Sequence, residues 1–183
     1  MELNKNTDYH NSRIEEAERI YNSDSLLPYR YSLVLTNKCN LSCSFCFQDR
    51  KKRDRALTLD DWIGFLSQLP DYAHLTLSGG EPLSFKGFDE FFLAADKRFT
   101  TNIITNGTLF NEKNIDMFAN SKNLQILSTS IDDIGNIVRG VKPVQWEKMK
   151  KMFDLLKSKN SKIIIDAKTV VLDENAKDLF SIY

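Results

Sequence analysis

Short apolar segments alternate with segments of helical periodicity along most of this chain, and this alternation constrains the fold more than any other feature of the sequence. The apolar segments fall at residues 31–36, 74–78, 101–105, 124–131 and 162–171. They are too continuously apolar for the strands of an antiparallel sheet with one face in water. Five successive strand–helix units therefore predict an α/β fold, with parallel strands and helices on the outer face of the sheet.

The segments between the strands have the apolar stripes and caps of amphipathic helices. Thr58 and Asp61 resemble a capping box at the start of one helix. Apolar residues then recur at positions i, i+3, i+4 and i+7, namely Trp62, Phe65, Leu66 and Leu69. Asn111 is predicted to cap a later helix, and a last helix is expected to begin near Asn175.

The 183 residues are enough for one domain with a sizeable core. We predict a polar leader at residues 1–29, with one short helix at about 12–21, followed by the core at residues 30–183. Lys plus Arg and Asp plus Glu both total 25, so no charge imbalance points to nucleic acid or an acidic membrane surface. No apolar run approaches the ~20 residues that cross a bilayer, and the N-terminus lacks a secretory signal, so a cytoplasmic location is expected.

Three cysteines lie close together at Cys39, Cys43 and Cys46, and the sequence has no others. Such an odd, tightly clustered set is not a disulfide framework, and a reducing compartment leaves all three as thiols. The spacing instead indicates a metal or an iron–sulfur cluster, whose usual protein ligands are thiolates. A zinc site completed by a histidine is the alternative, although neither His10 nor His74 has the usual finger spacing.

Three further motifs follow the next three strands, just as the cysteines follow the first. These motifs are Gly79-Gly80-Glu81-Pro82, Thr105-Asn106-Gly107 and Ser130-Ile131-Asp132. Taken singly, each has an ordinary explanation as a turn or a helix cap, and Arg139 has one as a solvated surface charge. However, the carboxyl ends of parallel strands form the edge where α/β sheets and barrels bind ligands. Because all four motifs follow strands in this way, they favour one common ligand site.

These segments resemble those of the radical S-adenosylmethionine (radical SAM) superfamily. CNLSCSFC at 39–46 is similar to the family's CxxxCxφC motif, with Phe45 as the aromatic residue. GGEPL at 79–83 and TNG at 105–107 look like its glycine-rich and third-strand motifs. The SID at 130–132 with Arg139-Gly140 looks like the SxD…RG stretch of the branch with peptide- and sulfatase-modifying (SPASM-type) enzymes. The resemblance covers roughly residues 30–180 and implies a partial (β/α)6 radical SAM barrel.

The resemblance implies two cofactors, a [4Fe–4S] cluster and S-adenosylmethionine (SAM). Cys39, Cys43 and Cys46 would hold three irons of the cluster, and the methionyl amine and carboxylate of SAM would chelate the fourth. The implied SAM-binding residues are Gly79, Gly80 and Glu81 at the amine, Asn106 near the ribose, Ser130 at the ribose or carboxylate, Arg139 at the carboxylate, Phe45 and Val170–Val171 near the adenine, and Asp132 among them.

The implied activity is reductive cleavage of SAM to methionine and a 5′-deoxyadenosyl radical that abstracts hydrogen from a substrate. The branch resemblance favours a peptide or protein side chain as substrate, and a reduced flavodoxin- or ferredoxin-like protein as electron donor. The basic segment at 50–55 could contact such a donor, although a solvated loop is the preferred interpretation.

The sequence departs from the family pattern at its C-terminal end. Family cores have six strand–helix units and many relatives in this branch add a cysteine-rich extension, whereas this sequence has five units and no cysteine after Cys46. We expect a fragment truncated before the sixth strand; a site completed by another subunit and a degenerate member are the alternatives. The alternative function is a non-catalytic iron–sulfur or SAM-binding module, or partner subunit, of a complete radical SAM enzyme.

Overall fold

Five parallel strands form one open sheet in the computed structural model, in the order β1-β2-β3-β4-β5. The structure describes residues 3–22, 27–48, 57–159, 162–177 and 179–181. The strands are Arg30–Val34 (β1), His74–Ser78 (β2), Thr100–Thr105 (β3), Leu124–Ser130 (β4) and Ile164–Lys168 (β5). Each strand pairs with the next along the chain, so the predicted parallel α/β architecture is confirmed.

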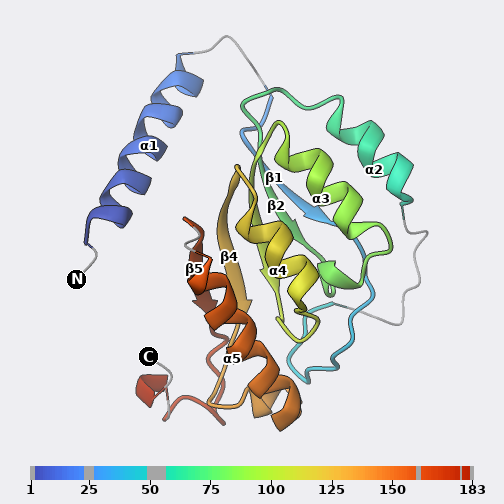
Figure 1. Cartoon of the computed structure of the whole chain (residues 1–183), viewed down its shortest axis with the longest axis vertical. Helices are drawn as coiled ribbons and strands as arrows, with labels where there is room; N and C mark the ends of the chain where they lie inside the picture. Colours follow the sequence, from blue (N-terminus) through green and yellow to red (C-terminus); the bar gives the residue numbers. More distant parts are fainter. Residues whose placement is uncertain (1–2, 23–26, 49–56, 160–161, 178, 182–183) are drawn as a thin grey trace.

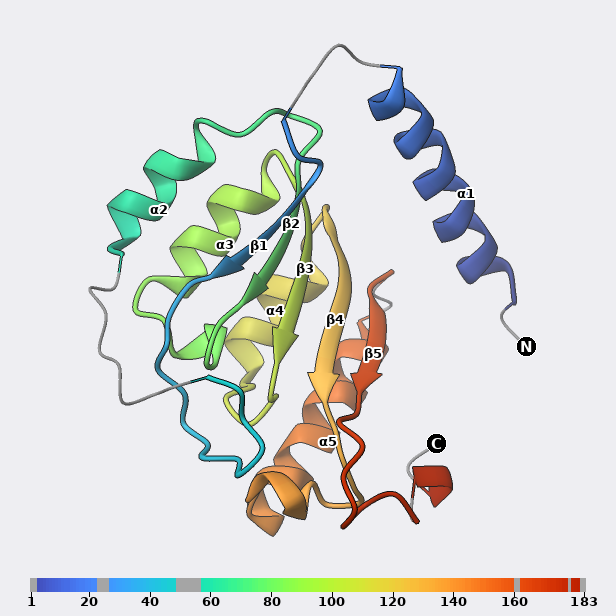
Figure 2. The same ribbon diagram turned by 180° about the vertical axis from the view of Figure 1, so that it is seen from behind.

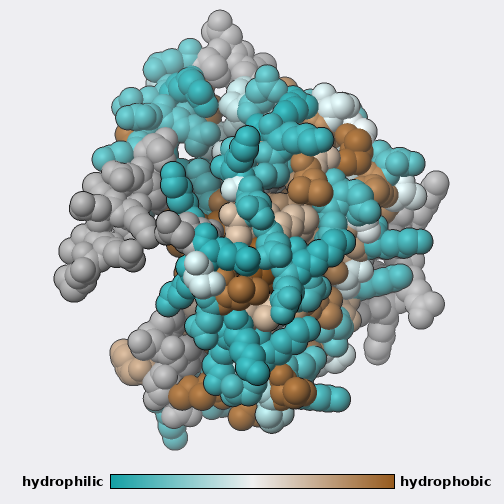
Figure 3. Space-filling model, in the orientation of Figure 1, coloured by the Kyte–Doolittle hydropathy of each residue, from teal (hydrophilic) through white to brown (hydrophobic). Residues whose placement is uncertain are grey.

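Four helices cover one face of this sheet, as Figures 1 and 2 show from opposite sides. They are Leu59–Leu66 (α2), Phe88–Asp96 (α3), Glu112–Ala119 (α4) and Pro143–Ser158 (α5). Short 3-10 turns lie at Pro82–Ser84 (η1), Ile137–Arg139 (η2) and Leu179–Ser181 (η3). The outward surface of the helical layer is largely hydrophilic, with separated hydrophobic patches (Figure 3).

The core lies between the sheet and this helical layer. On β2, Leu75 and Leu77 are fully buried against the helices, so the alternation of side chains turns His74, Thr76 and Ser78 to the other face. Aromatic side chains fill much of the helical side, and the rings of Phe92 and Phe118 meet edge to face at 5.4 Å. The face of the sheet opposite the helices is therefore free to present polar groups.

The predicted caps form as the sequence indicates. The Thr58 hydroxyl accepts the Asp61 amide at 3.2 Å, and the Asp61 carboxylate accepts the Thr58 amide at 2.8 Å. Asn111 caps α4 in the same reciprocal way with Asn114. The last helix expected near Asn175 is wrong: among the described residues this region forms a turn followed by the short η3.

The N-terminal helix Leu3–Tyr21 (α1) is longer than predicted and stands apart from the helical layer (Figures 1 and 2). Arg13 joins it to the rest of the chain, since its guanidinium lies 2.7 Å from the Tyr29 hydroxyl and 2.5 Å from Nδ1 of His74. His74 begins β2 on the face away from the helices, so this contact joins α1 to the amino end of β2 from that side. No helix among the described residues is long and apolar enough to cross a bilayer.

Candidate functional site

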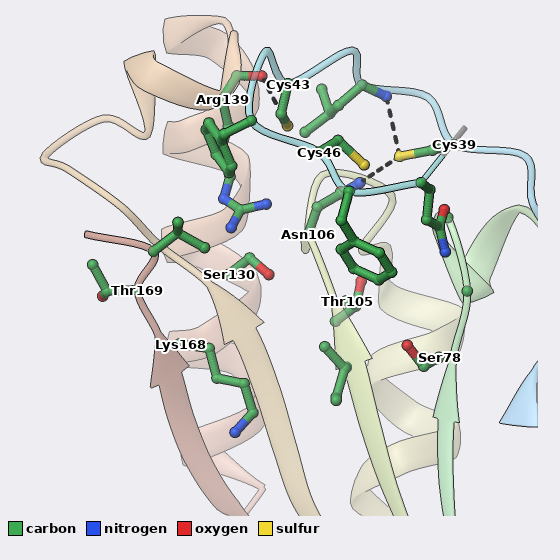
Figure 4. A pocket seen from close by; sticks show the side chains of 18 residues that line it. Cys39, Cys43, Cys46, Ser78, Thr105, Asn106, Ser130, Arg139, Lys168 and Thr169 are labelled. Atoms are coloured by element: carbon green, nitrogen blue, oxygen red, sulfur yellow. Dashed lines mark hydrogen bonds between the residues drawn. The ribbon is translucent and has the colours of Figure 1, made fainter. Parts of the chain in front are cut away.

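All but three of the predicted site residues line one cavity at the carboxyl ends of the strands. The cavity has a volume of about 290 Å³. The predicted residues that line it are Cys39, Cys43, Phe45, Cys46, Gly79, Gly80, Asn106, Ser130, Arg139 and Val170. Figure 4 shows the cysteines at one end of this cavity, with Lys168 and Ser78 at the other end. The loops after β1 to β5 thus meet at one edge, as expected for a parallel sheet.

The cysteine loop is fixed by local hydrogen bonds and by a small apolar cluster. The Leu41 amide donates to Sγ of Cys39 at 3.4 Å, and Sγ of Cys43 donates to the Arg139 carbonyl at 3.7 Å. Leu41 is buried with Val141 and Met149, which anchors the loop against α5. Within the described residues, no set of three or more His, Cys, Asp or Glu side chains is arranged as a site for a single metal ion.

The glycine pair allows the cysteine loop to approach the loop after β2. A Cβ on Gly79 would lie 2.5 Å from the Thr36 carbonyl oxygen, and one on Gly80 would lie 2.3 Å from that of Lys38. The Gly80 amide donates to the Thr36 carbonyl at 2.7 Å. At both Gly79 and Gly80, the position that a Cβ atom would occupy therefore faces the cysteine loop.

Glu81 is one of the three predicted residues outside the cavity lining. It is fully buried, and its carboxylate accepts hydrogen bonds from the Thr105 hydroxyl and the Asn106 amide, both at 2.7 Å, and from the Leu83 amide at 3.1 Å. Burial raises the pKa of this carboxyl, and the three hydrogen bonds oppose the rise. Glu81 therefore joins the loop after β2 to the end of β3.

Asn106 lines the cavity and contacts the first cysteine. Its side-chain amide donates to Asn40 Oδ1 at 3.0 Å and to Sγ of Cys39 at 3.7 Å. Its own Oδ1 accepts from the amide and the hydroxyl of Thr108, at 3.0 and 2.6 Å. The amide predicted to lie near a ribose is thus also within hydrogen-bond distance of a cysteine sulfur.

Asp132 is another predicted residue outside the lining, and it supports Arg139, which lies within the lining. Its carboxylate, fully buried, pairs with Nε of Arg139 at 2.6 Å and also accepts the Val170 amide at 2.8 Å. The Arg139 guanidinium lies over the Phe45 ring, 5.2 Å from its centre. Asp132 thereby links the ends of β4 and β5 to Arg139, which lines the cavity.

Two buried asparagines that sequence reasoning missed complete this support. Asn136 adopts a left-handed conformation with φ of 54°, accepts the Asp132 amide at 3.0 Å and donates to the Ser130 carbonyl at 2.7 Å. Asn175 donates to the carbonyls of Asp132 and Val170, both at 2.8 Å. The Asn136 position next to Gly135 carried a turn signal, because asparagine tolerates positive φ, whereas Asn175 carried none.

The cavity also has wall residues that the motifs did not mark. Lys168 ends β5 beside Ser130, and its Nζ lies 3.1 Å from the carboxylate of Asp166. Thr169 lines the cavity too, whereas Val171 does not. The basic segment at 50–55 lies outside the described residues.

Comparison with known proteins identifies the family of the chain. The profile of the Radical SAM superfamily matches residues 33–183. The chain is 36% identical over 117 residues to the sporulation killing factor maturation protein SkfB of Bacillus subtilis, which covers 62% of this chain and 28% of SkfB. It is 28% identical over 164 residues to an S-adenosylmethionine-dependent nucleotide dehydratase of Selenomonas ruminantium, covering 83% of this chain and 60% of that protein.

Solved structures share the fold. SuiB of Streptococcus suis, in a crystal structure with its precursor peptide SuiA, has a TM-score of 0.67 at 22% identity and matches 98% of this chain and 42% of SuiB. SuiB bound to S-adenosylmethionine has a TM-score of 0.65, also at 22% identity, over 99% of this chain and 42% of SuiB. The chain thus spans between 28% and 60% of the length of these relatives. Since the family profile matches most of the sequence, the chain belongs to the radical SAM superfamily, whose enzymes use a [4Fe–4S] cluster and SAM.

Proposed function

We propose that Cys39, Cys43 and Cys46 hold a [4Fe–4S] cluster and that the adjoining cavity binds SAM, as part of a radical SAM enzyme that modifies a peptide. The observation that carries the proposal is the convergence of the three cysteines, the glycine pair and Arg139 on one cavity. Three thiols leave one iron of such a cluster for SAM. When bound, the reduced cluster supplies an electron to SAM, whose cleavage to methionine and a 5′-deoxyadenosyl radical provides the species that abstracts hydrogen.

The residues of the cavity have distinct roles in this proposal. Arg139 is oriented by Asp132 through Nε and Nη2, which leaves its remaining edge for the carboxylate of SAM. The Phe45 ring and Val170 form apolar surface suited to the adenine. Ser130, on β4 beside Lys168, offers a hydroxyl to the ribose or carboxylate. Together these groups would hold SAM against the cysteine loop and limit the access of water.

A peptide is the proposed substrate, for two reasons. The SxD…RG stretch resembles that of peptide-modifying enzymes. SuiB was solved with a bound precursor peptide, and SkfB is named as the maturation protein of the sporulation killing factor. The cluster also needs a one-electron donor, and we propose a reduced flavodoxin- or ferredoxin-like protein. The three reduced thiols that the cluster requires agree with a cytoplasmic location.

The test is anaerobic reconstitution with iron and sulfide, followed by reduction with dithionite in the presence of SAM. We expect roughly four irons and four sulfides per chain and formation of 5′-deoxyadenosine. The Cys43→Ala variant is the matched control and should form none. A stable cluster that yields no 5′-deoxyadenosine would support the non-catalytic module instead, and one bound zinc with no sulfide would support the zinc site.

The substrate class needs a separate test, because one relative is a nucleotide dehydratase. Peptides from a fully deuterated cell extract and deuterated nucleoside triphosphates would be offered in parallel to the reconstituted protein. The deuterium in 5′-deoxyadenosine, measured by mass spectrometry, then reports which pool donated the hydrogen atom. Transfer from the peptides is the expected result, and transfer from the nucleotides alone would overturn the peptide assignment.

A further inference from the structure

The orientation of the Asn106 side-chain amide is determined by its neighbours. Its Oδ1 accepts two hydrogen bonds from Thr108, one from the amide at 3.0 Å and one from the hydroxyl at 2.6 Å. An amide nitrogen at that position would face the Thr108 backbone N–H, which can only donate, so the nitrogen points the other way. That way lies the sulfur of Cys39 at 3.7 Å and Oδ1 of Asn40 at 3.0 Å.

This arrangement is constrained because Asn106 and Thr108 are buried and the hydrogen bonds form a closed ring. Asn40 donates from its own amide to the Thr108 hydroxyl at 2.7 Å, which completes a ring of three side chains. The Asn106 backbone amide is held by the buried Glu81 carboxylate at 2.7 Å. Asn106 and Thr108 are only 6% and 5% exposed, so water competes weakly for these bonds.

Cys39 thus receives two N–H donors at its sulfur, the second being the Leu41 amide at 3.4 Å (Figure 4). Hydrogen bonds to cysteine sulfurs are among the factors that set the reduction potential of an iron–sulfur cluster. A donor stabilises the reduced cluster more than the oxidised one, because reduction adds negative charge that spreads onto the sulfurs.

We propose that Asn106 raises the reduction potential of the cluster through its hydrogen bond to Cys39, and that Thr108 is the positioning residue that directs this donor. The inference rests on the proposed function, since it requires that the cysteines bind a cluster. It gives Asn106 a role different from the ribose contact expected from the sequence. A ribose contact would act on SAM affinity, whereas a sulfur donor acts on the cluster before SAM is present.

The test is a redox titration of the reconstituted protein without SAM, followed by electron paramagnetic resonance. Asn106→Leu keeps the branched shape and removes the donor. We expect its potential to be more negative, so that the ratio of reduced to oxidised cluster at a fixed solution potential falls about fivefold, the effect of losing roughly one net hydrogen bond. Thr108→Val keeps the Asn106 amide but loses the hydroxyl that orients it, and it should shift the potential in the same direction by less.

Thr129→Val is the matched control, because Thr129 is buried and its hydroxyl has no hydrogen-bond partner among the described residues. It should leave the potential unchanged. An unchanged potential in both Asn106→Leu and Thr108→Val, with SAM affinity lowered in Asn106→Leu, would overturn the inference and favour the ribose contact. Failure of the wild-type chain to assemble any cluster is a different result, because it would overturn the proposed function itself. If Asn106→Leu does not retain a cluster, the shift in Thr108→Val decides the question.

Discussion

Gly80 shows how a single residue can determine whether the cysteine loop is placed correctly. Adding one methyl group in Gly80→Ala would bring a Cβ within 2.3 Å of the Lys38 carbonyl oxygen, a backbone atom that cannot move without displacing the cysteine loop. We expect a loss of stability of about 1–3 kcal/mol, the usual cost of overpacking, together with a lower iron content after reconstitution. Urea unfolding and iron analysis measure the two effects.

Gly64→Ala is the internal control for that experiment. Gly64 lies within α2, and a Cβ there would meet no atom within 4 Å. Alanine is the better helix former, so this variant should gain about 0.5–1 kcal/mol and keep full iron content. Equal behaviour of the two alanine variants would show that the close approach at Gly80 does not position the loop.

Residues in contiguous motifs could be predicted from the sequence, but the orientation and hydrogen-bond partners of several of their side chains could not. The motifs marked Glu81 and Asp132 as SAM-binding residues, and in the structure both carboxylates are fully buried and bind protein groups. A motif records that a residue type recurs at a position; it does not record which way the side chain turns. Asn175 could not be found because its partners, Asp132 and Val170, are set by the pairing of β4 with β5.

A double-mutant cycle on Asp132 and Arg139 tests whether the acid acts through the arginine. Arg139→Gln removes a charged hydrogen-bond donor, so SAM should bind about tenfold to a hundredfold more weakly to the cluster-loaded protein. Asp132→Asn should also weaken binding, and the double variant should be no weaker than Arg139→Gln alone. Equilibrium dialysis with labelled SAM gives the affinities. Additive losses would instead indicate a direct contact between Asp132 and SAM, and Asp154→Asn, exposed on α5, controls for the charge change.

At the scale of secondary-structure elements, the attachment of α1 depends on the partly buried charged side chains of Arg13 and Glu16. His74 lies close to Arg13, Glu16, Tyr29 and Arg30. The ring of Tyr29 meets that of His74 edge to face, with 5.8 Å between the ring centres. Burial first, and the Arg13 cation second, lower the pKa of His74 to about 4. Burial also contributes most to raising the pKa of Tyr29, so both side chains favour their neutral forms.

This arrangement predicts a loss of stability in mild acid. The unfolded chain binds a proton at His74 near pH 6.5, while the folded chain resists protonation until about pH 4, so stability falls as the pH drops through that window. Between pH 6.5 and 5 this one group should cost up to about 2 kcal/mol. Urea unfolding at the two pH values measures the loss, which His74→Gln should largely abolish.

His10→Asn is the control, because it removes the other histidine of the chain from an exposed position on α1. It should keep the pH dependence of the wild type. If His74→Gln retained the full slope instead, acidic side chains elsewhere would have to account for it.

The elements themselves were the most predictable level, since their periodicity is a local property. All five strands appear where the apolar segments indicated, with β2 at the predicted residues and β5 shorter than the apolar run at 162–171. The expected helix near Asn175 failed for a non-local reason. The Asn175 side chain accepts the Leu172 amide at 2.7 Å and donates to Asp132, and this turn places its amide between β4 and β5.

At the scale of the whole molecule, the fold brings four loops from distant parts of the sequence to one cavity. Backbone contacts join the first two loops, Glu81 joins the second to the third, and Asp132 joins the fourth to the end of β5. Loops that are already joined by hydrogen bonds need little reorganisation to bind a ligand, which favours binding. A ligand that touches all of them should in turn stabilise the entire sheet rather than one loop.

This coupling can be measured as a change in global stability. SAM at a hundred times its dissociation constant should add about 2.7 kcal/mol to the free energy of unfolding of the cluster-loaded protein, provided that it binds only the folded state. For a chain of this size that gain corresponds to a rise in Tm of roughly 5–10 °C. The Cys43→Ala protein should show almost no rise, because its loops lack the iron that SAM chelates. An equal rise in both proteins would mean that the cavity binds SAM without the cluster. The cysteine loop would then be a neighbour of the SAM site rather than part of it.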